Sequence, residues 1–596
     1  MCCAASCGPA PAPAALPPPT AARVAGVDRG PAPTNDATRA LHALFDEEWE
    51  RTMRESPTYA SSLGDHRWDA LWDDASLEAI ARREKGDRDA LARLRAIPRG
   101  GLSREDALSY DLFARKYGLA VEGQPFRTYL LAINQRSGVQ TADDLADSMP
   151  FETAKHYDDW TARLRALPAY VDQTIALLRE GVAAHIVHPK VVMARLPGQL
   201  DKQIVDDPTK SPFYAPYKKI PKTFSEAERA RITKEADAAV REAVVPAFRK
   251  LKAYFVASYL PACSEGVGVW QIPRGDEVYA HEVRHHTTTS LSPREVHDIG
   301  LAEVARIRAE MEKVKARAGF KGSLAELSKF LRTDKRFFYK SGAELLAAYR
   351  DMSKRIDPLL VKLFGTLPRM PYGVAAIPDN VAPDTTTAYY REPAADGSRA
   401  GTYFVNLYKP ETRPKWEMPA LSLHESVPGH HLQIAIAMEH KDLPAFRRYE
   451  YLTAYAEGWA LYAESLGEEM GLYDDPYDKL GQLNYEMWRA VRLVVDTGIH
   501  HLKWDRQRAI DFFLENTARS PLDVTNEVDR YIVWPGQALA YKMGELRIKQ
   551  LRADLTKELG ARFDLRAFHD AVLRSGALPL DVLEAHVRAE LTAPAK

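Results

Sequence analysis

Apolar residues recur at intervals of three and four among charged residues along most of the chain, and this spacing predicts amphipathic helices. In the first 267 residues the pattern is clearest over Ala37–Arg54, Ser76–Leu94, Thr153–Leu167, Ala169–Ala183 and Ser225–Tyr259. A long helix is also expected after Ser292, because Ser-Pro-Arg-Glu is a capping box with proline at the first helical position. Helical spacing returns towards the C-terminus, so the sequence predicts a mainly α protein.

The spacing changes to that of strands between Met370 and Lys409. β-Branched and aromatic residues are separated here by Pro, Asp-Gly and Gly turn signals. We therefore expect a small β-sheet at about residues 370–409, with Gly401–Leu407 as its edge strand.

The stretch from Leu421 to Gly467 holds the residues whose types and spacing are typical of a catalytic metal site. His424 and Glu425 form the first half of the zinc motif H-E-x-x-H, in which two imidazoles bind zinc and the glutamate handles the attacking water. Pro428 stands where the second histidine of that motif would be. The motif is therefore interrupted, and another histidine must complete it.

Two histidines follow the interruption. On a regular helix His430 would point roughly 120° away from His424, and His431 would lie roughly 10 Å further along the axis. Neither could share one ion with His424 unless the helix is distorted, which Pro428-Gly429 makes feasible. If two residues loop out, His430 becomes the ligand. If three do, His431 takes that place, and its other expected role is to orient a ligand or contact substrate.

A third ligand is expected on the helical stretch from Tyr455 to Glu464. Glu457 lies 27 residues after His430, which allows one turn and a return. It would complete a His2Glu site with a position open for water. Each of these residues alone is more often structural, but their combination predicts one Zn²⁺ ion per chain.

The two halves of this site also carry a resemblance. The pattern E-G-W-A-L-Y-x-E is similar to the downstream glutamate helix of gluzincin aminopeptidases, whose first Glu is a zinc ligand. Together with H-E-x-x-P-G-H-H it resembles the signature of the bacterial domain-of-unknown-function family 885, a zincin-like group often found as predicted lipoproteins, over about residues 40–590. The resemblance implies a mainly α, zincin-like body with a deep cleft and a small sheet beside the metal helix.

Further site residues follow from likeness to metallopeptidases. In zincins an edge strand near the metal pairs with extended substrate, which makes Asn406 a candidate substrate-binding residue, with an ordinary hairpin as the alternative. Arg530-Tyr531 resembles the Arg-Tyr pair of the all-helical dipeptidyl carboxypeptidases of the angiotensin-converting type. That likeness implies Tyr531 as the donor to the oxyanion and Arg530 as a substrate contact; a packed aromatic and a structural ion pair are the alternatives. Asp496 is a candidate partner for a zinc-binding imidazole or for a buried arginine.

The expected function is zinc-dependent hydrolysis of peptide bonds by a metallopeptidase, with a carboxypeptidase or dipeptidase as specific forms. Zinc would be held by His424, His430 and Glu457, while Glu425 accepts a proton from water and passes it to the leaving amine. Two alternatives stay open. One is a metal-dependent hydrolase of non-peptide amides or esters, and the other is a non-catalytic substrate-binding lipoprotein.

Charge and composition exclude several partners. The chain has 81 Lys and Arg against 82 Asp and Glu, so no basic field favours nucleic acid. No apolar run approaches the roughly 18 residues of a transmembrane helix. We expect a peptide or small amide as substrate.

The N-terminus is rich in Pro and Ala and holds Cys2, Cys3 and Cys7, which leaves Cys263 alone in the body and excludes a disulfide framework. We expect residues 1–35 to form a disordered tail and residues 36–592 to form a single catalytic domain. The segment before and including Cys7 resembles the end of a lipobox, which predicts a lipid anchor, a tether and a location in the cell envelope or periplasm, with a start upstream of Met1. Incidental cysteines on a cytoplasmic protein are the alternative.

Overall fold

The computed structural model describes residues 35–378, 382–384, 386–395 and 397–593. The predicted tail, apart from its last residue, and the candidate lipid site at Cys7 lie outside the described residues. The first described residue, Asn35, caps the first helix by accepting a hydrogen bond from the Thr38 backbone.

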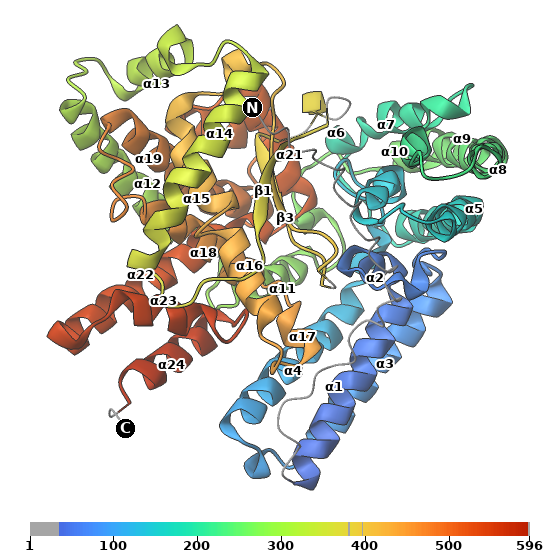
Figure 1. Cartoon of the computed structure of the whole chain (residues 1–596), viewed down its shortest axis with the longest axis horizontal. Helices are drawn as coiled ribbons and strands as arrows, with labels where there is room; N and C mark the ends of the chain where they lie inside the picture. Colours follow the sequence, from blue (N-terminus) through green and yellow to red (C-terminus); the bar gives the residue numbers. More distant parts are fainter. Residues whose placement is uncertain (1–34, 379–381, 385, 396, 594–596) are drawn as a thin grey trace, which may run out of the picture.

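Helices form the N-terminal part of the molecule, drawn in blue to green on one side of the strands in Figure 1. Their bounds are α1 Asp36–Glu55, α2 Pro57–Leu63, α3 Leu77–Arg95, α4 Arg104–Gly123, α5 Ala154–Ala183, α6 Lys190–Met193, α7 Leu196–Gln203, α8 Glu226–Ala239, α9 Val245–Tyr254 and α10 Leu260–Ala262. The two helices expected to meet at Pro168 are one continuous helix, α5. Leu164, Leu167 and Val171 on either side of the proline are fully buried, so one apolar face continues across it.

The C-terminal part is also helical and carries the candidate site. Its helices are α11 Gly275–Thr287, α12 Pro293–Arg317, α13 Leu324–Thr333, α14 Gly342–Ile356, α15 Met418–Glu425, α16 His430–Glu439, α17 Ala445–Arg448, α18 Thr453–Ser465, α19 Pro476–His500, α20 Arg506–Asn516, α21 Pro521–Val533, α22 Ala540–Leu559, α23 Leu565–Leu573 and α24 Leu580–Leu591. The capping box at Ser292 is confirmed: Ser292 and Glu295 each bind the other's backbone at the start of α12. The mainly α fold class is therefore confirmed.

Within the described residues, the expected small sheet has three strands, β1 Tyr372–Ala376, β2 Ala388–Arg391 and β3 Gly401–Val405. Their order is β1-β3-β2, with β1 parallel to β3 and β2 antiparallel to it. The prediction that Gly401–Leu407 is an edge strand is wrong, because β3 is the central strand. Its alternation indicates a half-buried strand, with Tyr403 and Val405 fully buried, but alternation does not reveal which strands flank it.

Helix α19 is buried along most of its length, and it packs against α12, α15 and α20. The main hydrophobic core reaches from Leu41 on α1 to Val587 on α24. Four charged residues of α19, namely Glu486, Arg489, Arg492 and Asp496, are buried in this core. Glu486, Arg489 and Arg492 each form an ion pair, so α19 brings ion pairs to the centre of the molecule, as buried charges require.

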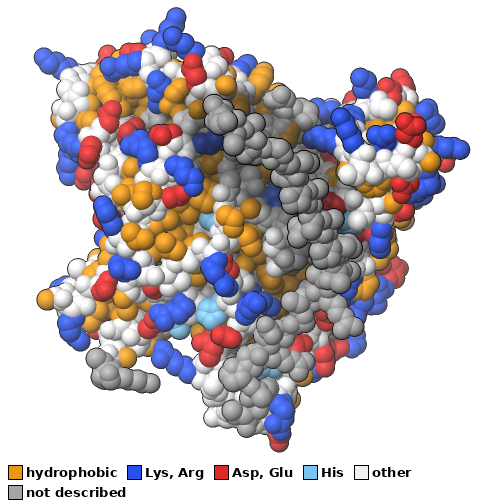
Figure 2. All heavy atoms as spheres, viewed as in Figure 1, with side chains coloured by type: hydrophobic (Ala, Val, Ile, Leu, Met, Phe, Trp, Pro, Cys, Tyr) orange, Lys and Arg blue, Asp and Glu red, His pale blue; other side chains and the backbone are white. Residues whose placement is uncertain are grey.

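The outer surface carries charges of both signs. Figure 2 shows Lys and Arg side chains interspersed with Asp and Glu over the face in view, in agreement with a net charge of −1. Among the described helices, none combines the length and the apolar character needed to cross a bilayer.

Candidate metal centre

The interrupted motif breaks the helix between the two candidate histidines. α15 ends at Glu425 and α16 begins at His430, so both histidines lie close to the break. Gly429 is required there: a Cβ on this residue would lie 1.9 Å from the carbonyl oxygen of His424. The chain folds back tightly because this position has no side chain.

Helix α18 fixes the break from the other side. The Nε1–H of Trp459 donates to the carbonyl oxygen of Pro428 at 2.8 Å. The neighbouring Gly458 packs directly on α22, since its Cβ would lie 2.4 Å from the Cα of Gly544. The Gly-Trp pair that follows Glu457 in the sequence therefore seats α18 between the break and α22.

His424, His430 and Glu457 come together in this arrangement. Oε2 of Glu457 lies 3.4 Å from Nε2 of His424 and 3.5 Å from Nε2 of His430, and the three ligand atoms all lie within 4.8 Å of one another. Zinc ligands about 2.0–2.1 Å from a tetrahedral ion are about 3.3–3.4 Å apart, whereas N–H···O hydrogen bonds are usually about 2.7–3.2 Å long. The two measured spacings fit ligands around one ion better than a hydrogen-bonded cluster.

The electrostatics of this triad also fit a cation. Burial disfavours the charge of His424, but Glu457 and Glu464 outweigh it and raise its pKa to about 9. Burial likewise opposes ionisation of Glu457, but the two imidazoles hold its pKa well below the usual value. Oε2 of Glu457 is buried and has no hydrogen-bond partner among the described residues. Such an atom is costly unless something binds it.

A second carboxylate orients the first histidine. Nδ1 of His424 lies 2.9 Å from Oε1 of Glu464, which leaves Nε2 directed at Glu457. Of the two roles considered for Asp496, that of partner to a zinc-binding imidazole is not seen: Asp496 accepts hydrogen bonds from Tyr279 and the Gly536 backbone at 2.6 and 3.1 Å. The sequence contains the signal for Glu464: it stands seven residues after Glu457, two turns along the same face of α18.

His431 and Asn406 lie apart from the triad. Nδ1 of His431 contacts the Tyr390 hydroxyl at 2.8 Å and Nε2 contacts the Met370 carbonyl oxygen at 3.0 Å, so it joins α16 to the sheet. Burial lowers its pKa to about 4. Asn406 is 1% exposed, and its amide donates to the carbonyl oxygens of Ala382 and Thr386. Neither residue lines the cavity at the triad.

This cavity has a volume of about 360 Å³, within the range of small-molecule sites. His424, His430 and Glu457 line it, and so does the half-buried Glu425. The edge strand that borders it is β2, through Ala388, Tyr389 and Tyr390. The arrangement therefore brings three candidate ligands and a carboxylate to one hollow.

The structure places the two candidates on α21, Arg530 and Tyr531, in different surroundings. Arg530 lines the cavity, whereas Tyr531 does not. The Tyr531 hydroxyl accepts from Nε of Arg492 at 2.9 Å and from Trp488 at 3.2 Å, and it donates to Glu527 at 2.8 Å. Sequence reasoning missed Tyr451, a cavity residue whose hydroxyl donates to Oε1 of Glu457 at 2.8 Å.

Comparison with known proteins places the chain in a family. The profile of the family described as "Bacterial protein of unknown function (DUF885)" matches residues 57–587. No curated protein matches the sequence. The chain is 28% identical to a predicted lipoprotein from Colwellia psychrerythraea, whose crystal structure it matches with a TM-score of 0.89 over 94% of this chain and 100% of that one. A predicted lipoprotein of unknown function from Shewanella oneidensis has the same fold, with a TM-score of 0.69 at 17% identity over 93% and 99% of the chains.

Proposed function

This chain belongs to the DUF885 family of bacterial proteins of unknown function, and we propose that it is a zinc-dependent hydrolase of peptide bonds with a zincin-like catalytic centre. The spacing of the triad carries the proposal. Two imidazole nitrogens stand 3.4 and 3.5 Å from one carboxylate oxygen in a cavity large enough for a small substrate. Two imidazoles and a carboxylate are a donor set that suits zinc.

The residues divide into ligands and a proton carrier. His424, His430 and Glu457 would hold one ion, with Glu464 fixing the tautomer of His424. Zinc held there supplies Lewis-acid chemistry, lowering the pKa of a water ligand and polarising a carbonyl group. Glu425 lines the same cavity, where it accepts a proton from water and returns it to the leaving amine.

A hydrogen-bond donor is also needed for the developing oxyanion. Tyr531 is the candidate from sequence, but it does not line the cavity, and its hydroxyl contacts three side chains that do, those of Trp488, Arg492 and Glu527. Tyr451 has its hydroxyl beside Glu457, and its side chain is half exposed. We assign the donor role to Tyr451, whose hydroxyl proton would turn from Oε1 of Glu457 to the oxyanion, with Tyr531 positioning Arg492.

Metal analysis together with peptide hydrolysis tests this function. Protein stripped by a chelator should regain one zinc per chain and should then cleave a mixed peptide library. Glu425→Gln should keep the zinc and lose about 10²–10⁴-fold in rate, whereas Glu411→Gln, at an exposed glutamate that does not line the cavity, should keep both. Absence of zinc uptake, or equal rates for wild type and Glu425→Gln, would disprove the proposal.

The same assay distinguishes the two alternatives. Zinc uptake with turnover of amide or ester substrates, but of no peptide, would identify a non-peptide hydrolase. Binding of library members without turnover by the zinc-loaded protein would identify a binding protein.

We also propose that Cys7 carries a lipid that anchors the protein in the cell envelope. The support is the Ala-Ala-Ser-Cys sequence and the description of both structural neighbours as predicted lipoproteins. Mass spectrometry of the native protein tests it, because an unmodified Cys7 in the mature chain would exclude the anchor.

A further inference from the structure

Five arginines line the cavity that holds the triad. They are Arg136 from the loop region after α4, Arg489 and Arg492 from α19, Arg519 from the segment between α20 and α21, and Arg530 from α21. We call this set the arginine wall. Arg489, Arg492 and Arg519 are buried, although arginine is seldom buried without a partner.

One carboxylate is shared by three members of the wall. Glu527 alone contacts three of its members, with N···O distances of 3.2 Å to Arg492, 3.3 Å to Arg530 and 3.8 Å to Arg136. Burial opposes ionisation of Glu527, but these guanidinium groups outweigh it and lower its pKa to about 2. Three positive charges therefore share one negative charge at this part of the cavity.

A fourth arginine also lacks a carboxylate of its own. Arg489 contacts Glu464 at 3.3 Å, and the same oxygen of Glu464 lies against His424. If His424 and Glu457 bind a metal ion, Glu464 stays committed to the histidine. Neither Glu527 nor Glu464 is therefore left to pair with a single arginine of the wall when the triad is filled.

Several guanidinium nitrogens of the wall have no hydrogen-bond partner among the described residues. They are Nε of Arg489, Arg519 and Arg530, and Nη1 of Arg492. The ring of Trp488 orients the wall, with the guanidinium carbons of Arg519 and Arg492 at 3.5 and 4.4 Å from its centroid. Buried charges without full pairing are costly, so five guanidinium groups around one cavity indicate a ligand of negative charge.

We propose that the arginine wall binds the free C-terminal carboxylate of a short peptide, so that the protein is an exopeptidase acting at C-terminal ends. This inference rests on the proposed peptide hydrolysis. Guanidinium groups match carboxylate geometry with paired hydrogen bonds. Because the wall and the triad line one cavity of about 360 Å³, a peptide held by its terminus has its last peptide bonds near Glu425 and the triad.

Matched peptides test the proposal on the zinc-loaded protein. Two peptides that differ only in a free or an amidated C-terminus should differ in kcat/KM by about 100-fold or more in favour of the free acid, because the amide leaves buried charge unpaired. A third peptide, amidated but with glutamate as its last residue, separates a side-chain carboxylate from the terminal one. Equal kcat/KM for acid and amide, or rescue of the amide by that glutamate, would overturn the assignment.

Variants of the arginine wall test which residues bind the C-terminal carboxylate of the peptide. Arg530→Gln should reduce the acid-over-amide preference about tenfold or more, mainly through a higher KM for the acid, and Arg530→Lys should have a smaller effect. The matched control is Arg506→Gln, which removes an arginine paired with Asp529 of α21 outside the cavity. Arg136→Gln replaces a partly exposed member and serves if Arg530→Gln does not fold. A wall variant that lowers acid and amide turnover equally contradicts the proposal.

A binding experiment separates this inference from the proposed hydrolysis. Calorimetry of the metal-free protein with an N-acetylated dipeptide should show binding of the free acid and not of the amide. If this holds while the zinc-loaded protein cleaves nothing, the wall is supported and the hydrolysis is wrong. Equal binding of both forms, or binding of neither, overturns the wall.

Discussion

At the residue scale, Glu464 determines how His424 is presented. It is fully buried at the C-terminal end of α18, and its Oε1 lies 2.9 Å from Nδ1 of His424. Partners of this kind raise the basicity of a metal-binding imidazole and fix its orientation.

We expect Glu464→Gln to weaken zinc binding by about 10–100-fold, because the amide removes the negative charge behind the imidazole. Competition with a chelator measures the affinity. Glu468→Gln, at a glutamate on the surface just beyond α18, is the control and should bind as the wild type does. An unchanged affinity in Glu464→Gln would show that the contact with His424 is structural.

The two histidines after the break should differ in effect. His430→Ala should abolish zinc binding, since His430 faces Glu457. His431→Ala should retain zinc, since both nitrogens of His431 point to the sheet, where they contact the Tyr390 hydroxyl and the Met370 carbonyl oxygen. Metal content by atomic spectroscopy decides between them. Loss of zinc in His431→Ala alone would mean that His431, and not His430, is the second histidine ligand.

Replacement of Tyr451 and replacement of Tyr531 should have different kinetic effects. Tyr451→Phe should lower kcat by about 10²–10³-fold at unchanged zinc content, because it removes the donor beside the triad. Tyr531→Phe should act mainly on KM, because its hydroxyl positions Arg492. Steady-state kinetics on a common peptide distinguish them, and the reverse pattern would return the donor role to Tyr531.

Sequence reasoning located the residues that lie close together along the chain. His424, Glu425, His430 and Glu457 all fall within one stretch, and the structure gathers them at one cavity. The arginine wall was not found in this way, apart from Arg530. Arg136 lies 353 residues before Arg489, and the other four members are divided among α19, the segment after α20, and α21. Periodicity carries no information on which of these segments face the same cavity.

At the element scale, the break between α15 and α16 depends on one position. Gly429 lies against the His424 carbonyl so closely that any side chain would displace the backbone of a candidate ligand. Elsewhere the helix limits follow from local signals, as the caps at Ser292 and Asn35 show. The order of the strands does not, because β3 enters between strands that precede it in the chain.

We expect Gly429→Ala to destabilise the fold by about 1–3 kcal/mol, the usual range for an overpacked site, and to lose zinc. Urea unfolding and metal analysis measure the two effects. Gly198→Ala is the control, because nothing lies within 4 Å of its Cβ position on α7. Full zinc binding in Gly429→Ala would mean that the break tolerates a side chain.

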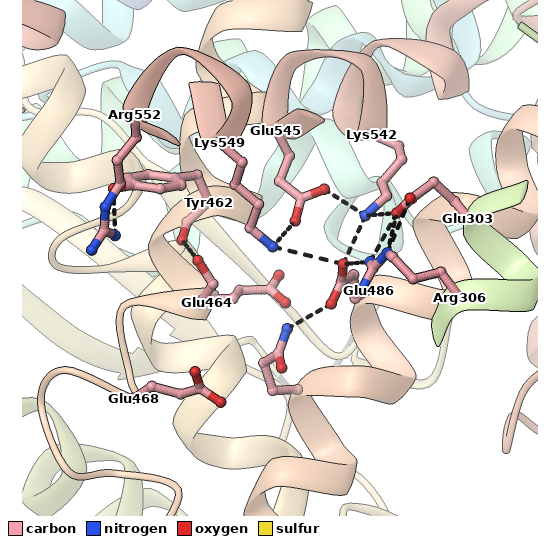
Figure 3. A network of polar contacts seen from close by, with 12 residues as sticks. Glu303, Arg306, Tyr462, Glu464, Glu468, Glu486, Lys542, Glu545, Lys549 and Arg552 are labelled. Atoms are coloured by element: carbon pink, nitrogen blue, oxygen red, sulfur yellow. Dashed lines mark hydrogen bonds and ion pairs between the residues drawn. The ribbon is translucent and has the colours of Figure 1, made fainter. Parts of the chain in front are cut away.

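At the scale of the whole molecule, a buried ionic network joins three helices behind the site. In Figure 3 side chains from α12, α19 and α22 converge on Glu486. Lys542 is fully buried and lies 2.8 Å from Glu486, 2.6 Å from Glu545 and 3.0 Å from Glu303. Because α22 also packs on Gly458 of α18, this network supports the helix that carries Glu457.

Lys542→Met should destabilise the protein by about 3–5 kcal/mol at neutral pH, because it leaves buried carboxylates unpaired. Burial opposes ionisation of Glu486, but Lys542, Lys549 and Arg306 outweigh it and hold its pKa well below the usual value. Its stabilising contribution is therefore complete above the unfolded pKa of about 4.3 and is lost as the pH falls further. The difference between wild type and Lys542→Met should shrink in the same acidic range.

Urea unfolding of both proteins at pH 7 and at steps below pH 4.5 measures this difference. Lys313→Met, at an exposed lysine paired with Glu310 on α12, is the control and should change stability by about 1 kcal/mol or less. A constant difference across the acidic range would assign the loss to packing instead of charge.

One oxygen of Glu464 touches both His424 and Arg489. Metal binding at the triad and carboxylate binding at the arginine wall therefore both affect the contacts of Glu464. The two binding equilibria belong to one thermodynamic cycle. Whatever factor a bound carboxylate contributes to the affinity for zinc, zinc must contribute to the affinity for that carboxylate. In such a cycle the metal and the peptide terminus act as reciprocal effectors, with a carboxylate at the end of α18 as the element that links them.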